Sequence, residues 1–347
     1  MSGESRVRVG LIGAGGNMKA RHIPGFRRLS NVDLVAVANR SRASGEKVAS
    51  EFGIARVYDT WQELLKAADV DAVCIGTWPY MHCEMTLAAL EAGKHVLCEA
   101  RMAMNAREAR TMLEASRRHP GLVTQIVPGP PTLEVDSTVV DLLKQGYFGS
   151  LKALELSVAS GFADPAAPLH WRQDASLSGM NILTMGIWYE CIQRWLGQPE
   201  SVMAMAETAV TTRRGGNGQP VPVTIPDQID VLARFFGGVI AHLRFSSIAG
   251  LAPAPEVWMY GTEATVRFDA GAKKLFGGRK GDAALTEIVI PKESRVGWRV
   301  EEEFISAIQG KEKVSRTSFE DGVRYMEFTE AVNQSLKEGR AVAVKPL

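Results

Sequence analysis

Short, continuously apolar runs alternate with longer amphipathic stretches through the first part of the chain. The apolar runs predict strands at residues 7–12, 33–38, 57–58, 71–76, 94–98 and 122–127. The stretches between them predict helices at residues 17–28, 42–52, 60–67, 80–92 and 105–118, of which Pro24 must bend or end the first. Apolar strands that alternate with helices are typical of a parallel sheet covered on both faces, so we expect an α/β domain.

The alternation stops at the proline-rich residues 128–131, and a different pattern follows. Helices are predicted at residues 134–145, 180–196, 299–309 and 318–338. Strands are predicted near residues 151–159, 202–210, 228–236, 238–246, 256–260, 264–268 and 286–290. Strands in succession, with the helices held apart, indicate a C-terminal α+β domain with a large, mostly antiparallel, open-faced sheet. We therefore expect two domains, residues 1–128 and residues 129–347.

The composition excludes several classes of partner. A formal net charge of +1 over 347 residues leaves no basic excess for nucleic acid or for an acidic membrane surface. No apolar run approaches the ~20 residues that cross a bilayer, and the polar segment 1–6 lacks the features of a secretory signal. The cysteines form no C-x-x-C pair, which indicates buried thiols and no metal site; they are Cys74, Cys83, Cys98 and Cys191. We expect a cytoplasmic protein.

A glycine-rich turn joins the first predicted strand to the first predicted helix. It reads Gly13-Ala14-Gly15-Gly16-Asn17-Met18. Gly13 permits a tight turn, and Gly15 lets the main chain approach a pyrophosphate whose charge the helix N-terminus stabilises. Met18 takes the place of the third glycine of G-x-G-x-x-G. Because a strand precedes the turn and a helix follows it, the sequence predicts a Rossmann-type dinucleotide site here.

The end of the second predicted strand selects between the two nicotinamide dinucleotides. An acidic residue at this place would hydrogen-bond the ribose hydroxyls of NAD. The sequence instead continues with Asn39, Arg40 and Ser41, which we assign to cofactor binding. Arg40 can pair with a 2′-phosphate, Ser41 can donate to it, and no carboxylate repels it. We therefore favour NADP(H) and keep NAD(H) as the alternative.

Segments spread over nearly the whole chain resemble the glucose–fructose oxidoreductase, inositol dehydrogenase and rhizopine-catabolism family (Gfo/Idh/MocA). They are residues 13–18 (GAGGNM), 77–82 (TWPYMH), 87–102 (LAALEAGKHVLCEARM), 171–172 (WR), 178–186 (SGMNILTMG), 260–263 (YGTE) and 319–340 (FEDGVRYMEFTEAVNQSLKEGR). The resemblance implies a Rossmann domain, then a substrate-binding and oligomerisation domain, with the active site at the C-terminal edges of the Rossmann strands. It also implies hydride transfer between the nicotinamide and a carbinol carbon, usually of a sugar or cyclitol.

The resemblance further places the loop after the fourth predicted strand against the cofactor. Thr77 and Trp78 are expected to touch the cofactor, and Glu99 matches the glutamate of the family's Glu-Lys-Pro motif. His82 belongs to the same set, although we interpret it chiefly as a structural residue that helps to open the following helix. His22 is also interpreted as structural.

The chain departs from the family at the residues that handle the hydroxyl proton. Ala100 stands where the motif lysine belongs, and Arg101 where its proline belongs. On the apolar helix of the second domain, Thr184, Trp188 and Cys191 align with the family's aspartate, histidine and second aspartate, and their spacing puts them on one helix face. None of the three has a pKa suited to general base catalysis near neutral pH.

Other side chains near these positions are candidates for the missing roles. Arg101 can bind an oxyanion or a carboxylate of a substrate through charge-assisted hydrogen bonds. His170 in the loop before the helix and Tyr189 on the helix are the further catalytic candidates. The candidates for substrate binding are Arg101, Trp171, Arg172, Thr184 and Trp188.

Three functions are consistent with these residues. The first is an NAD(P)-dependent oxidoreductase that acts on a sugar, a sugar acid or a cyclitol with a non-standard acid/base set. The second is a dinucleotide-dependent glycoside-cleaving or lyase-type enzyme with no net redox change. The third is a non-catalytic ligand-binding homologue. The open face of the predicted second sheet suggests a homo-oligomer, a dimer or a tetramer.

Overall fold

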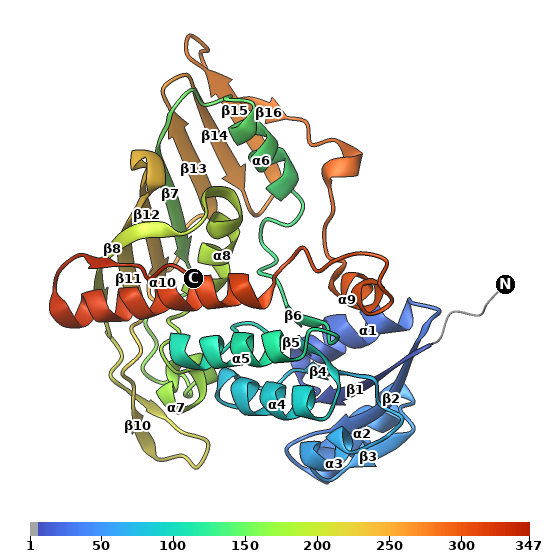
Figure 1. Cartoon of the computed structure of the whole chain (residues 1–347). Helices are drawn as coiled ribbons and strands as arrows, with labels where there is room; N and C mark the ends of the chain where they lie inside the picture. The colour runs from blue at the N-terminus through green and yellow to red at the C-terminus, as the bar shows by residue number, and fades with distance from the viewer. Residues whose placement is uncertain (1–5) are drawn as a thin grey trace. The chain divides into compact units, whose positions relative to one another are not determined.

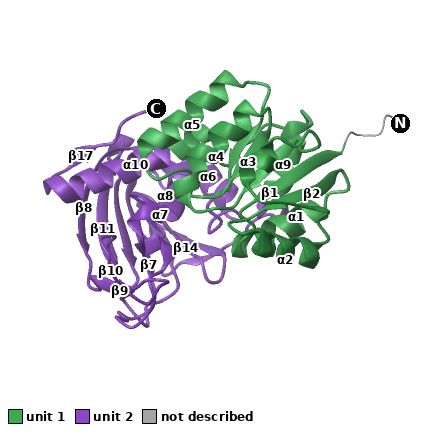
Figure 2. Ribbon diagram, turned by 90° about the horizontal axis from the view of Figure 1, so that it is seen from below, with its two compact units in different colours: residues 1–128, 299–323 green, residues 129–298, 324–347 purple. Residues whose placement is uncertain are grey.

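The computed structural model describes residues 6–347 of the chain. The chain forms two compact units (Figure 2). Unit 1 contains the chain up to Pro128 together with the segment Arg299–Val323, and unit 2 contains Gly129–Trp298 and Arg324–Leu347. The first boundary falls where the predicted alternation of strands and helices stops.

Unit 1 is built on a parallel six-stranded sheet with the order β3-β2-β1-β4-β5-β6 (Figure 1). Its strands are β1 (Val7–Ile12), β2 (Val32–Ala38), β3 (Arg56–Tyr58), β4 (Ala72–Ile75), β5 (His95–Cys98) and β6 (Thr124–Ile126). The chain order reverses between β1 and β4, and ligands of open α/β sheets bind at the strand ends beside such a reversal. The predicted Rossmann fold is confirmed.

Unit 1 has helices between its successive strands. They are α1 (Ile23–Arg27), α2 (Arg42–Phe52), α3 (Trp61–Leu65), α4 (Pro79–Glu91) and α5 (Ala106–Arg118). Side-chain oxygens of Ser41, Thr60 and Asn105 cap α2, α3 and α5 at their N-termini. The predicted helix 17–28 is divided, because a π-helical turn η1 (Met18–His22) precedes α1. Pro24 lies in the first turn of α1 and has no N–H to donate, so the hydrogen-bond pattern changes there.

The segment Arg299–Val323 corrects the predicted second domain of residues 129–347. Its helix α9 (Val300–Ile308) packs on α1 of unit 1. Gln125 Nε2 donates to Glu303 Oε2 at 2.7 Å, and the Ile126 amide donates to the carbonyl oxygen of Thr317 at 3.0 Å. An apolar helix face does not reveal which neighbour it covers, so sequence order alone assigned this segment to the wrong unit.

Unit 2 is built on a nine-stranded sheet with the order β16-β15-β14-β13-β7-β12-β11-β8-β17. Its strands are β7 (Leu151–Ala159), β8 (Pro199–Glu207), β11 (Gln228–Phe235), β12 (Ile240–Ser246), β13 (Glu256–Gly261), β14 (Ala264–Asp269), β15 (Lys274–Arg279), β16 (Thr286–Ile288) and β17 (Val342–Ala343). All pairs are antiparallel except β7 and β12. This mixed, mostly antiparallel sheet confirms the predicted α+β class, although β15 and β17 were not predicted. A short ribbon of β9 (Thr212–Arg214) and β10 (Pro220–Pro222) lies outside the sheet.

Helices cover one face of the sheet of unit 2. They are α6 (Asp136–Lys144), α7 (Ala175–Ser178), α8 (Met185–Leu196) and the part of α10 (Phe319–Glu338) that belongs to this unit. The Ala204 amide of β8 donates to Ser335 Oγ of α10 at 3.0 Å, and the Tyr189 ring of α8 stacks on Phe328 of α10. Large apolar side chains remain exposed on the sheet, notably Met203, Met205 and Leu232. Among the described residues, no helix is long and apolar enough to span a membrane.

Candidate functional site

The glycine turn after β1 is tightly packed on one side and open on the other. Gly13 has a φ of +74°, and a Cβ there would lie 2.7 Å from Thr77 Cγ2 and 2.9 Å from the Thr77 amide nitrogen. A Cβ on Gly16 would meet nothing within 4 Å, and one on Gly15 only the Gly13 carbonyl oxygen at 3.9 Å. The main chain at Gly15 and Gly16 is therefore accessible to a phosphate at the start of the following helix.

Met18 replaces the third glycine of the fingerprint without opening the packing. The Met18 side chain is buried. Its Cε would lie only 2.7 Å from a Cβ on Gly76, so a side chain at residue 76 would clash with it. The third glycine normally allows close packing of helix and strand. Here the missing side chain of Gly76, directly after β4, provides that space. The altered fingerprint is therefore compatible with the dinucleotide turn.

The three residues after β2 have different roles in the structure. Asn39 Oδ1 accepts a hydrogen bond from the Ala14 amide at 2.7 Å and so fixes the glycine turn. Ser41 caps α2. Arg40 is exposed and makes no ion pair with any residue in the described part of the chain. Its neighbour Arg42 differs, because Glu46 and Asp59 each bind its guanidinium at 2.9 Å.

A cavity of about 300 Å³ opens beside this strand end, and its size is at the lower limit of typical ligand pockets. It is lined by Ile12, Gly13, Ala38, Asn39, Arg40, Asp59, Thr60, Trp61, Gln62, Thr77, Tyr80, Met81 and Met85. The aromatic and methionine side chains suit a nucleoside base, and Arg40 brings a cation to the same cavity. The residues therefore fit the adenosine part of a dinucleotide. Trp61 was not predicted to belong here, because nothing in its own helix indicates the neighbouring strand end.

The loops after β4 and β5 are tied together by His82. The side chain is fully buried, and its ring nitrogens lie 2.9 Å from the carbonyl oxygens of Thr77 and Arg101. Burial lowers the pKa of His82. This imidazole supports the main chain of the two loops, in line with the structural role expected for it, and contact of Thr77 and Trp78 with a cofactor stays a prediction.

Glu99, directly after β5, holds the glycine turn from the other side. Its Oε1 accepts hydrogen bonds from Asn17 Nδ2 and from His22 Nε2, the latter at 3.0 Å, and the Ala100 amide lies 3.2 Å from Oε2. Burial opposes ionisation of Glu99, but the hydrogen bond and the charge of His22, together with the hydrogen bonds from Asn17 and the Ala100 amide, outweigh it, and the pKa of Glu99 is lowered. His22 Nδ1 contacts Glu301 Oε1 of α9 at 2.6 Å. The sequence carries no signal for this last contact.

Arg101 is almost fully buried, with 1% of its surface exposed. Because the guanidinium has almost no solvent-accessible surface, a substrate cannot contact it without a path through the surrounding side chains. Binding of a substrate oxygen by Arg101 therefore stays a prediction. Its neighbour Ala100 offers no titratable group. Unit 1 therefore has no lysine at the end of β5 to exchange a proton with a substrate hydroxyl.

The face of α8 that replaces the family's acid/base residues has no general base. Thr184 precedes the helix, and Trp188 is 6% exposed. Cys191 is buried with its Sγ 3.4 Å from the carbonyl oxygen of Ile187, and burial raises its pKa to about 11. These three residues remain neutral near pH 7, as expected from their chemistry.

The structure corrects the prediction that Tyr189 is catalytic. The side chain is fully buried, and its ring lies parallel to that of Phe328 with centroids 3.6 Å apart. Burial raises the pKa of the Tyr189 hydroxyl well above its usual value. Tyr189 is a core residue between α8 and α10, because its position on the helix turns it toward the apolar interior of unit 2.

His170, Trp171 and Arg172 come together at the short 3-10 turn η2 (Trp171–Gln173). His170 Nδ1 accepts from the Arg172 amide at 3.2 Å and caps this turn, which weighs against a catalytic role. Burial, and then the charge of Arg172, lower the pKa of His170. The Arg172 guanidinium lies 4.2 Å from the Trp171 ring centre, a cation–π arrangement that joins two of the predicted substrate-binding residues.

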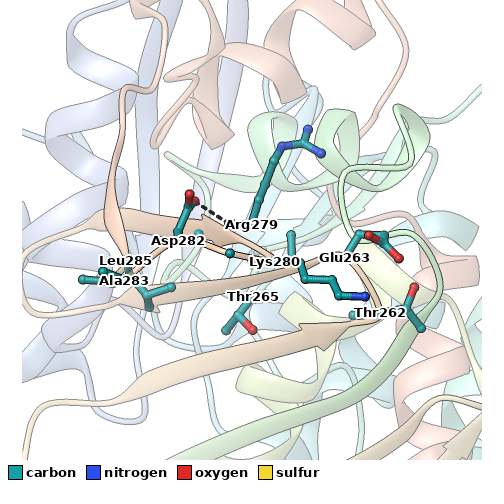
Figure 3. A pocket seen from close by; sticks show the side chains of 13 residues that line it. Thr262, Glu263, Thr265, Arg279, Lys280, Asp282, Ala283 and Leu285 are labelled. Atoms are coloured by element: carbon teal, nitrogen blue, oxygen red, sulfur yellow. Dashed lines mark hydrogen bonds between the residues drawn. The ribbon is translucent and has the colours of Figure 1, made fainter.

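A second hollow, of about 370 Å³, lies in unit 2 beside β14 and β15 (Figure 3). Lys280 extends toward the side where Glu263 and Thr262 lie, and Asp282 Oδ2 accepts from the Arg279 amide at 2.7 Å. The hollow contains none of the predicted site residues. Among the described residues, no group of three or more His, Cys, Asp or Glu side chains is arranged to hold a metal ion.

A glycine turn with open main chain, a nucleoside-sized cavity at the end of β2 and a second domain built on a large sheet define a dinucleotide-binding protein of the two-domain Rossmann class. The model of an oxidoreductase family with an NAD-binding Rossmann fold matches residues 7–126, and the GFO/IDH/MocA C-terminal domain matches residues 137–267. The chain belongs to the Gfo/Idh/MocA oxidoreductase family.

Individual relatives agree with this assignment. The chain is 26% identical over 289 residues to levoglucosan dehydrogenase of Pseudarthrobacter phenanthrenivorans, and the match covers 76% of this chain and 73% of that protein. It is 27% identical over 203 residues to an uncharacterised oxidoreductase of Rhizobium meliloti, covering 58% of this chain and 60% of that one.

Solved structures show the same fold over the whole length. An NAD binding oxidoreductase from Klebsiella pneumoniae has a TM-score of 0.85 at 25% identity and covers 99% of this chain and 100% of its own. Levoglucosan dehydrogenase in complex with NADH and L-sorbose has a TM-score of 0.87 at 22% identity, covering 98% of this chain and 99% of its own. The latter likeness concerns the fold alone.

Proposed function

We propose that this chain is an NADP(H)-preferring oxidoreductase that transfers hydride to or from a carbinol carbon of a sugar, sugar acid or cyclitol. The observation that carries the cofactor choice is Arg40, an exposed cation that lines the cavity at the end of β2 and has no ion-pair partner in the described chain. The substrate class rests on family membership and on the sugar named for levoglucosan dehydrogenase.

Unit 1 supplies the groups that hold the cofactor. The main-chain amide of Gly16 binds the pyrophosphate, Gly15 lets the phosphate approach because it has no side chain, and Asn39 holds the turn that presents them. Arg40 pairs with the 2′-phosphate, which distinguishes NADP(H) from NAD(H). When bound, the cofactor supplies the hydride acceptor or donor. Thr77 and Trp78 at the end of β4 line the path toward the nicotinamide.

Unit 2 supplies candidate groups for the substrate. We propose that Trp171 and Arg172 form an aromatic and cationic surface for a polyol or sugar acid, together with Thr184 and Trp188. Arg101 of unit 1 is proposed to bind a substrate oxygen. With Tyr189 in the core and His170 capping a turn, we assign the hydroxyl proton to no side chain of unit 2 and propose that solvent accepts it.

A second candidate function, a ligand-binding protein without turnover, is favoured by one specific observation. Ala100 and the α8 face of Thr184, Trp188 and Cys191 contain no group that exchanges protons near pH 7. Such a protein would bind the cofactor in its cavity but would not catalyse hydride transfer. Turnover separates the two candidates.

The experiment is a screen for hydride transfer. Purified protein is incubated with NADP⁺ and a panel of sugars, sugar acids and cyclitols, and the nicotinamide absorbance is followed. The oxidoreductase proposal expects reduction with at least one member of the panel. Tight binding of NADPH, with no turnover on the panel in either direction, would favour the ligand-binding candidate instead.

We also propose a homo-oligomer that uses the uncovered face of the sheet in unit 2. Met203, Met205 and Leu232 expose 44%, 75% and 50% of their surfaces there, and Leu232 pairs directly with Met203 across the strands. Apolar side chains gathered on one sheet face are typical of protein contacts. The free thiols, three of them buried, are in keeping with the cytoplasmic location proposed for the protein.

A further inference from the structure

Three ionisable side chains of unit 1, two of them buried and one partly buried, form a chain of hydrogen bonds that links three separate segments. His22 of η1 is fully buried and lies between Glu99, which follows β5, and Glu301 of α9. Its two ring nitrogens contact carboxylate oxygens at 3.0 Å and 2.6 Å. A carboxylate oxygen accepts a hydrogen bond, so both ring nitrogens donate and the imidazole carries its second proton.

The formal charges of these three side chains, taken by themselves, do not cancel. Glu99 and Glu301 contribute two negative charges and His22 one positive charge, which leaves one negative charge. Burial disfavours the charged imidazole, but the hydrogen bonds to Glu301 and Glu99 outweigh it and raise the pKa of His22 to about 9. Other titratable groups nearby are the thiols of Cys74 and Cys98, whose pKa values burial raises well above the usual range. They stay neutral.

Arg101 is a further charged group in this part of the unit. It follows Glu99 by two residues and is permanently protonated, so its contribution is the same in every variant of the triad. The effect of removing one charge from the triad on the affinities of the two cofactor forms can therefore be compared between variants, because the charge of Arg101 is common to all of them.

The strand order leads us to expect the nicotinamide on the same side of the cofactor site as the triad. The adenosine cavity is at the ends of β1 and β2, and a dinucleotide crosses the sheet edge at the reversal of strand order between β1 and β4. Its other half then lies over the ends of β4 and β5. Glu99 follows β5 directly and holds Asn17 of the glycine turn, so its carboxylate lies at this edge of the sheet.

We propose that the triad of Glu99, His22 and Glu301 is a fixed negative charge that favours the oxidised cofactor over the reduced one. The nicotinamide ring is cationic when oxidised and neutral when reduced, so a negative charge near it stabilises the oxidised form more than the reduced form. His22 and Glu301 are positioning residues in this arrangement, since they act through Glu99. The inference rests on the proposed binding of a nicotinamide dinucleotide.

The test compares the affinities of the two redox forms in Glu301→Gln, which is isosteric and removes one negative charge. Glu302→Gln is the matched control, because Glu302 is the next residue of α9, is 53% exposed and pairs with Arg299. Dissociation constants for NADP⁺ and NADPH are measured by tryptophan fluorescence at pH 6, where His22 remains protonated and hydrogen-bonded to Glu99. We expect the preference for NADP⁺ to fall by up to about tenfold in Glu301→Gln, because one unit of negative charge is removed from the triad.

A purely structural role would change both dissociation constants by the same factor, and an unchanged ratio in a folded Glu301→Gln variant overturns the proposal. A second measurement needs no variant. In the natural chain the triad gains a second negative charge as pH rises through the His22 pKa, so the preference for NADP⁺ must increase between pH 7 and pH 10. A flat ratio over that range contradicts the proposal even if Glu301→Gln does not fold.

The proposed function and this inference fail in different ways. If neither NADP⁺ nor NADPH binds the natural chain, the dinucleotide proposal is wrong and the inference falls with it. If both bind and their ratio responds neither to Glu301→Gln nor to pH, only the role of the triad is wrong.

Discussion

His22 shows most clearly how a single side chain links folding to the site. Its raised pKa, about 9 against an ordinary value of 6.5, means that the folded state binds the imidazole proton more tightly than the unfolded chain. The resulting stabilisation is fully present below about pH 6.5 and is lost as pH rises through about 9. Its size is about 3 kcal/mol.

His22→Gln should therefore lower the thermal unfolding midpoint strongly at pH 6–7, because it leaves two buried carboxylates without a cation between them. The difference from the natural chain should shrink above pH 9, where His22 has lost its charge. His242→Gln is the control, since His242 also contacts a carboxylate, Asp230, but is 48% exposed. Equal pH profiles for the two variants would show that His22 is not charged in the folded protein.

At the same scale, the residues of the cofactor site were predictable where local chemistry determines them. Gly13 and Asn39 follow their strands directly, so the apolar strand pattern is enough to locate them. The replacement of the third glycine by Met18 was not interpretable, because the compensating residue, Gly76, belongs to another strand end. Tyr189 was wrongly predicted to be catalytic, because the side of α8 that faces the core is determined by its packing against α10, which the sequence does not show.

At the scale of elements, the regular strands and helices of unit 1 follow from apolar periodicity and from side-chain caps. Thr60 and Asn105 were recognisable caps, and both accept from the expected main-chain amides. In unit 2 the strand β15 was missed, because its sequence KLFGGR contains two glycines and lacks the apolar alternation of its neighbours.

The helix α9 marks the limit of prediction from sequence. Its residues follow unit 2 along the chain but pack on unit 1, and its acidic residues fill positions that only the folded unit defines. The Glu301 carboxylate lies where a Cβ on Gly25 would stand, so the helix approaches α1 at a residue without a side chain. Contacts between segments so distant in sequence leave no periodic signal in either of them.

At the scale of the whole molecule, the uncovered sheet face predicts self-association. Leu232→Glu would place a charge among Met203 and neighbouring apolar side chains, and we expect it to reduce the mass in solution to that of a smaller oligomer or a monomer. Light scattering after size exclusion measures the mass.

Leu251→Glu is the matched control for that variant, because Leu251 is 96% exposed in the loop between β12 and β13 and does not belong to the sheet face itself. It should leave the mass unchanged. A natural chain that is already monomeric, or a Leu232→Glu variant with the natural mass, would exclude this face as the contact.

A fluorescence titration of the natural chain with NADPH and NADH tests the proposed cofactor preference most directly. The protein has seven tryptophans to report binding, and co-purified dinucleotide is removed first. Arg40→Ala is compared with Arg42→Ala, whose guanidinium is already held by Glu46 and Asp59. We predict that the natural chain prefers NADPH, that Arg40→Ala weakens NADPH binding by about 1–3 kcal/mol without affecting NADH, and that Arg42→Ala keeps the preference. Binding of neither dinucleotide, or a preference for NADPH that survives in Arg40→Ala, would contradict this account.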